Sequence, residues 1–185
     1  MRTALWVLAA TIAMPSAALA QDVIEWSSER RLSRADFKGR VPASAGKASM
    51  SWLNIDLSWG CEVGELVATA RATFDPSRSW WRAASGNVWQ ADSGSAVQRD
   101  AQLLQHEQTH FDLTEVAVRR IRRHFDELKD ACDEPGGTDE VPHDIAKIDR
   151  ELQEEQRRYD RETGHGTNVS AQARWTARAK KLLHR

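Results

Sequence analysis

The stretch LLQHEQTHFD (residues 103–112) lies inside the longest helical pattern of this 185-residue chain. Apolar residues recur every three to four positions from about 96 to 129, which predicts one amphipathic helix. Positions four residues apart lie one above the other on a helix, so His106 and His110 can present their imidazoles to one point. Because apolar residues continue along that face, we expect both histidines to point into the protein.

The histidine pair has the spacing of zinc ligands, and Glu107 lies beside it. Two neutral imidazoles suit zinc, and a catalytic zinc site keeps one position for water. Glu107 leaves the helix about 100° around from His106, so its carboxylate can reach that water without binding the metal. The motif therefore predicts a hydrolase in which Zn²⁺ polarises a carbonyl group and Glu107 is the general base. The alternative is a pair of hydrogen-bonded core histidines.

A third ligand must come from elsewhere in the chain. A metzincin would need glycine and histidine three and six residues beyond His110, where this chain has Leu113 and Val116, so that subclass is excluded. A thermolysin-like site would take a glutamate from the next helix. The downstream candidates are His165 between two glycines, the nearby Asp160, and the helix residues Glu151, Glu154 and Glu155.

The remaining patterns predict an α+β fold. ELVATARATF (residues 65–74) alternates like a strand, and similar runs broken by turn residues over 23–82 predict a small N-terminal antiparallel sheet. Three-to-four spacing predicts two further helices, over about 141–161 and 170–184. We expect about three helices to pack on this sheet.

The first twenty residues, MRTALWVLAATIAMPSAALA, have the layout of a cleavable signal peptide. The predicted cleavage after Ala20 leaves a mature chain in the periplasm or outside the cell. We expect residues 21–185 to form one domain, strand-rich over 23–82 and helical over 96–185. No stretch approaches the roughly 18 apolar residues of a membrane span.

Composition argues against some partners. Cleavage removes one of the 26 basic residues, Arg2, and none of the 27 acidic residues. This balance gives no electrostatic reason to expect nucleic acid or an anionic membrane surface as a partner. We expect instead a peptide or protein substrate in the cell envelope.

The chain has two cysteines, Cys61 and Cys132. Disulfides persist in exported proteins, and two lone cysteines make a poor zinc site. We predict that they pair and so connect the strand-rich part to the end of the long helix.

Several sequence blocks resemble one bacterial family. SRADFKG, FDPSRSWW, LLQHEQTHFD, and YDRETGHG followed by QARW are similar, in this order, to domain of unknown function 922, described as predicted secreted zinc-dependent proteases. The resemblance covers about residues 26–175. It implies export, His106 and His110 as zinc ligands, and Glu107 as the general base. It also places YDRETGHG with the active site, which favours His165 as the third ligand.

Two further residues near these blocks have open roles. Tyr159 either donates its hydroxyl to an oxyanion or packs against the motif helix, and we prefer packing. Asp112 either orients a metal-bound imidazole or lies exposed beside a partner such as Arg119.

We therefore expect a zinc metalloprotease with a compact α+β, zincin-like fold. The alternative is a zinc-stabilised periplasmic binding or scaffold protein without catalytic turnover. Hydrolysis of an envelope amide other than a protein is a third interpretation, since the water-activating chemistry is the same.

Overall fold

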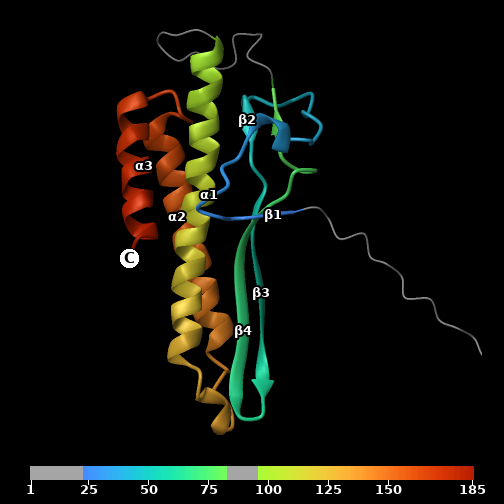
Figure 1. Ribbon diagram of the computed structural model, residues 1–185, viewed down its shortest axis with the longest axis vertical. Helices are drawn as coiled ribbons and strands as arrows, with labels where there is room; N and C mark the ends of the chain where they lie inside the picture. The colour runs from blue at the N-terminus through green and yellow to red at the C-terminus, as the bar shows by residue number, and fades with distance from the viewer. Residues whose placement is uncertain (1–22, 83–95) are drawn as a thin grey trace, which may run out of the picture.

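The computed structural model describes residues 23–82 and 96–185. Strands occupy the first of these parts and long helices the second, which confirms the predicted α+β fold (Figure 1). The predicted signal peptide and its cleavage site lie outside the described residues.

A long hairpin forms most of the larger sheet. Strands β3 (Leu53–Glu62) and β4 (Glu65–Phe74) pair antiparallel along their whole length. The short strand β1 (Ile24–Glu25) pairs with the other edge of β4, which gives the order β1-β4-β3. Alternate β4 side chains point to the helices, so Ala72 and Phe74 are fully buried.

A second, two-stranded sheet forms from β2 (Ser49–Met50) and β5 (Trp80–Trp81). Between β2 and β3 the chain leaves the ladder at Ser51 and Trp52. The Trp52 N–H donates to Ser79 Oγ at 2.8 Å, and the Trp52 carbonyl accepts from the Asp75 N–H at 2.9 Å. The strand-rich part thus contains two small sheets where the sequence predicted one, because these side-chain and turn bonds divide the run.

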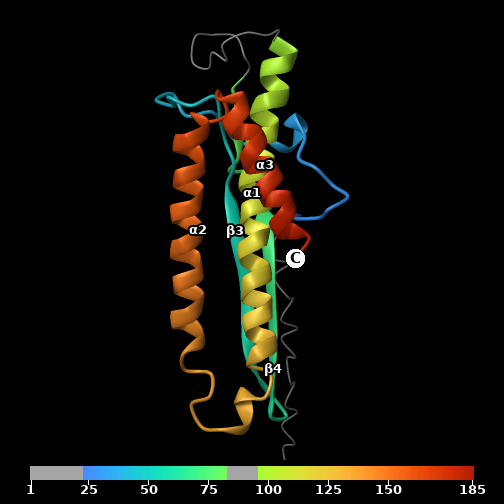
Figure 2. The same ribbon diagram turned by 90° about the vertical axis from the view of Figure 1, so that its left-hand side faces the viewer.

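The three predicted helices are present, with ends within about two residues of the expected ones. They are α1 (Ala96–Glu127), α2 (Val141–Thr163) and α3 (Val169–Leu183). α1 packs against β4 on one side and against α2 and α3 on the other (Figures 1 and 2). α1 is therefore the central element, with β4 on one side of it and α2 and α3 on the other.

The turn between α2 and α3 is built by its sequence. Gly164, His165 and Gly166 all have left-handed backbone, with φ of 54°, 54° and 88°. Asn168 then caps α3 by accepting a hydrogen bond from the Ala171 N–H at 3.0 Å. The turn is compact, and it returns the chain to α1.

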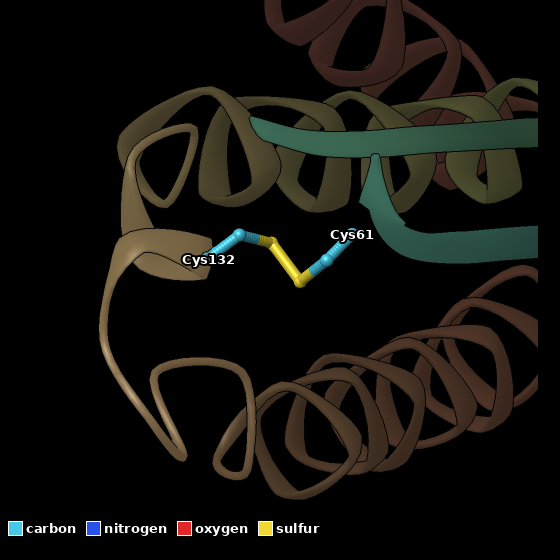
Figure 3. Close-up of a disulfide and its surroundings, with 2 residues drawn as sticks. All are labelled: Cys61 and Cys132. Atoms are coloured by element: carbon cyan, nitrogen blue, oxygen red, sulfur yellow. A yellow bond between two sulfur atoms is a disulfide. The ribbon is translucent and has the colours of Figure 1, made fainter. Parts of the chain in front are cut away.

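Cys61 and Cys132 form a disulfide, as predicted (Figure 3). The bond joins the end of β3 to a 3₁₀ turn (Ala131–Asp133) after α1. It therefore links the turn end of the β3–β4 hairpin covalently to the chain just after the C-terminus of α1.

In the described parts of the chain, we find no helix with the length and apolarity needed to cross a membrane.

Candidate metal centre

Three titratable side chains from two helices meet at one point. His106 and His110 come from the middle of α1, and Asp160 comes from the last turns of α2. His106 Nε2 lies 3.1 Å from His110 Nε2 and 3.1 Å from Asp160 Oδ1. His110 Nε2 lies 2.9 Å from the same oxygen. The three atoms form a nearly equilateral triangle.

The size of this triangle fits a tetrahedral metal ion. Zinc bonds of 2.0–2.2 Å in tetrahedral geometry put neighbouring donor atoms about 3.3 Å apart. The observed separations of 2.9–3.1 Å need only a small expansion to reach that value. The residues present therefore fit a zinc ion held by two imidazoles and one carboxylate.

Two glutamine side chains set the protonation of the imidazoles. His110 Nδ1 is hydrogen-bonded to Gln156 Oε1, and His106 Nδ1 to Gln172 Oε1 at 3.3 Å. The Gln156 amide nitrogen donates to the His110 carbonyl at 3.0 Å, so its oxygen must face the ring. Since an amide oxygen only accepts, each Nδ1 carries the proton and each neutral ring has its lone pair on Nε2.

The donor set thus requires positive charge at its centre. Two Nε2 lone pairs and one carboxylate oxygen face one another at about hydrogen-bond distance, and they repel unless a proton or a cation lies between them. Outer partners of this kind, which fix the ring tautomer, are usual for metal-bound histidines.

The pKa shifts of His110 and Asp160 are opposite in direction, and both favour the charged form of the side chain. Burial disfavours the charged ring of His110, but the hydrogen bond to Asp160 and the charges of Glu107 and Asp160 outweigh it and raise the pKa of His110. Burial also opposes ionisation of Asp160, yet the hydrogen bonds from His106 and His110 hold the pKa of that carboxyl far below its usual range. The site favours an anionic carboxylate and attracts cations.

Glu107 lies beside the cluster without joining it. Its side chain is buried, and its two oxygens accept hydrogen bonds from different hydroxyls. Ser49 Oγ donates to Oε1, and Ser51 Oγ donates to Oε2, each at 2.5 Å. The carboxylate is therefore held apart from the three donor atoms, as a general base has to be.

His165, the predicted third ligand, lies at the edge of the cluster. Its Nδ1 is 3.3 Å from Asp160 Oδ1, and its side chain is 53% exposed. Donor atoms of His106, Asp160 and His165 all lie within 4.8 Å of one another. Asp160, the second candidate, takes the place between the two helix histidines, and His165 is placed as an additional donor. A side chain at Gly166 would press on His106, whose Cβ would be 3.0 Å away.

The helix glutamates do not reach the cluster. Glu151 pairs with Arg120, and Glu155 pairs with Arg178 at 2.8 Å. Glu154 is exposed. A thermolysin-like third ligand therefore has no support in the described residues.

Tyr159 and Asp112 have structural roles. Tyr159 is fully buried and stacks on the His106 ring at 4.7 Å, and its hydroxyl donates to Gln172 Oε1 at 2.8 Å. Both contacts agree with the expectation that Tyr159 packs against the motif helix. Asp112 is buried and accepts from Trp26 Nε1 at 2.9 Å and from Gln108 Nε2 at 2.8 Å. Both expectations for Asp112 were wrong, because Trp26 folds back from β1 onto α1.

The cluster opens into a cavity of about 850 Å³. Its lining includes the three donor residues, Glu107 and His165. It also includes apolar side chains of β3 and α2: Leu53, Ile55, Leu57, Trp59, Ile145 and Leu152. The cavity therefore combines a cluster of titratable side chains with apolar surface.

Sequence reasoning missed Gln156, Gln172, Ser49 and Ser51. The sequence could have indicated Gln156, because it lies four residues before Asp160 and so shares its helix face. No sequence pattern indicates the two serines, because Glu107, their partner, is more than fifty positions away.

A family model described as "Bacterial protein of unknown function (DUF922)" matches residues 16–166 of this chain. The matched span includes both histidines of α1, Glu107, Asp160 and His165. No curated protein and no solved structure matches the chain.

Proposed function

Since the chain belongs to the DUF922 family of bacterial proteins, whose function is unknown, we propose a function from its site: a zinc-dependent hydrolase, and specifically a metallopeptidase. The convergence of two Nε2 lone pairs and one carboxylate oxygen, with Glu107 held beside them, carries the proposal.

His106, His110 and Asp160 are the residues that would hold the metal. When bound, zinc supplies Lewis acidity toward a carbonyl oxygen and toward water. Two neutral imidazoles and one carboxylate leave the centre with one net positive charge. That charge favours a reaction whose transition state gains negative charge on oxygen.

Glu107 acts as the proton carrier. Its carboxylate lines the same cavity as the cluster and is not one of the three donors. It accepts a proton from the attacking water and later gives it to the leaving amine. The apolar wall of the cavity binds side chains of the substrate and excludes water.

Export is part of the proposal. A disulfide between Cys61 and Cys132 suits an oxidising compartment, and the first twenty residues have the layout of a signal peptide. We place the protein in the periplasm or outside the cell, where peptides and proteins of the envelope are its substrates.

Two measurements test this function. The first is the metal content of the purified protein, with iron measured beside zinc because two imidazoles and one carboxylate also suit iron(II). We expect zinc at one equivalent per chain. A folded chain that stays metal-free in the presence of zinc contradicts the proposal.

The second measurement is cleavage of a broad peptide library. We expect Glu107→Gln to abolish cleavage and to retain the metal, and the exposed Glu154→Gln to change neither. Turnover that survives in Glu107→Gln removes Glu107 from its role.

A zinc-stabilised binding or scaffold protein is the second candidate. One observation favours it: both oxygens of Glu107 already accept a hydrogen bond from a serine. In that case chelation unfolds the protein, and no member of the peptide library is cleaved.

A further inference from the structure

We propose that Ser49 and Ser51 are positioning residues that keep Glu107 in the role of base. Their hydroxyls hold the carboxylate away from the metal and prevent it from becoming a ligand. This inference rests on the proposed function, because it assigns the serines to the same reaction.

The two hydroxyls restrain both ends of one carboxylate. Ser49 Oγ is 2.5 Å from Oε1 of Glu107, and Ser51 Oγ is 2.5 Å from Oε2. One bond would leave the carboxylate free to rotate about that contact. Two bonds to different oxygens fix the plane and the position of the carboxylate. Hydrogen bonds to a charged acceptor are roughly twice as strong as neutral ones, so this restraint is strong.

An unrestrained carboxylate beside zinc would bind it. Glu107 follows the ligand His106 in sequence and shares its cavity. A carboxylate oxygen is a good zinc ligand at about 2.0–2.2 Å. If Glu107 took the open position, it would displace water and cancel the net positive charge of the site. The base and its water would be lost together.

β2 and the residues directly after it carry the two serines. Ser49 and Ser51 are two positions apart, so an extended chain directs both hydroxyls to the same side. β2 is held by pairing with β5, where Ser49 lies opposite Trp81. Beyond β5, the Arg82 N–H donates to the Ala48 carbonyl at 2.8 Å. These bonds hold Ser49, and the bonds of Trp52 to Ser79 and Asp75 hold the chain next to Ser51, so both serines are positioned independently of Glu107.

A structural role for the hydroxyls has different consequences. If they only satisfy a buried carboxylate, their loss leaves an unpaired buried charge and lowers stability. The metal and its water would then be unchanged. The two roles are separated by the coordination of the metal in serine variants, not by stability.

Cobalt(II) in place of zinc gives the required signal, because its visible absorption depends on the number and type of its ligands. We compare the cobalt-loaded full mature protein with Ser49→Ala/Ser51→Ala. We expect the spectrum to change in the double variant as Glu107 replaces water. Adding Glu107→Gln to the double variant should restore the wild-type spectrum, because the amide is a poor ligand.

Kinetics of the zinc form supply a second readout. We expect kcat of the double serine variant to fall at least about tenfold with KM unchanged, the sign of a lost transition-state interaction. Ser49→Thr and Ser51→Thr keep a hydroxyl and should retain most of the activity. If the double variant does not fold, Ser51→Ala at the half-buried position provides the same test.

The outcomes are distinct. An unchanged cobalt spectrum together with kcat within about twofold of wild type would overturn the inference while leaving the proposed function intact. A wild-type protein that binds neither cobalt nor zinc would overturn the proposed function and the inference with it.

Discussion

The Nε2 atoms of His106 and His110 lie 3.1 Å apart. Each ring has its Nδ1 bonded to a glutamine oxygen, so the two Nε2 atoms meet as acceptors and not as a donor and an acceptor. A neutral core pair would share a proton between its rings. Such a pair is relieved by a proton or by a cation between its rings, and the first three predictions below test whether zinc takes that position.

Zinc should stabilise the fold. An ion that binds the native chain at a concentration of 100 Kd adds about 2.7 kcal/mol to the free energy of unfolding. For a chain of this size that raises Tm by about 5–10 °C. Thermal denaturation of chelated protein, with and without added zinc, measures the shift. His110→Ala should lose the response and the exposed His143→Ala should keep it. An equal shift in both variants would show that zinc binds elsewhere.

Asp160→Asn should weaken zinc binding more than His165→Ala does. Asp160 Oδ1 contacts both helix histidines, whereas His165 contacts the cluster from a half-exposed position. We expect a loss in affinity above the 10–100-fold typical of outer-sphere changes for Asp160→Asn, and a smaller loss for His165→Ala. Competition with a chromophoric chelator measures both. The reverse order would make His165 the third ligand.

Gln156→Ala should reduce zinc affinity although Gln156 does not contact the metal. It fixes the tautomer of His110, and losing such a partner costs on the order of 10–100-fold in affinity. Gln153→Ala, three residues earlier on α2 and exposed, is the matched control. The same chelator competition applies, and equal affinities for the two variants would remove this role from Gln156.

Loss of the disulfide should destabilise the fold. Cys61 and Cys132 are 71 positions apart, and closing a loop of that length corresponds to about 4 kcal/mol in the chain-entropy model. We expect Cys61→Ser/Cys132→Ser to lower the free energy of unfolding by that order in urea titrations. Wild-type protein treated with reductant should behave like the variant, and reductant should not affect the variant itself.

Asp36 should contribute stability that disappears in acid. Burial opposes its ionisation, but hydrogen bonds from Ser33 and Arg30 outweigh this and hold the pKa of Asp36 below its ordinary value of 3.8. A lowered native pKa means that the stabilisation is present above about pH 4 and is lost as pH falls through the native pKa.

Removing this carboxylate tests the pH dependence. Asp36→Asn should cost about 1 kcal/mol at neutral pH, because it removes the charge that accepts from Ser33 and Arg30, and less as pH falls toward 3. Urea titrations at several pH values measure the difference, with the exposed Asp126→Asn as the control. A cost that does not depend on pH would show that the charge of Asp36 is not involved.

Much of the fold was predictable because its signals are local. The spacing of apolar residues predicted all three helices, and the alternation of side chains along residues 65–74 predicted β4. The division of the strand-rich part into two sheets was missed because it depends on bonds from Trp52 to a distant turn, one to the Ser79 hydroxyl and one to the Asp75 backbone N–H.

The site divides in the same way. The sequence by itself determined that His106 and His110 share a helix face with Glu107 beside them, since the geometry of one helix fixes these relations. Only the tertiary structure decided that Asp160 lies between the histidines, that glutamines set their tautomers, and that two serines hold Glu107. Those contacts depend on how α2, α3 and β2 pack around α1, and residues more than ten positions apart in the chain carry no spacing rule that reveals such packing.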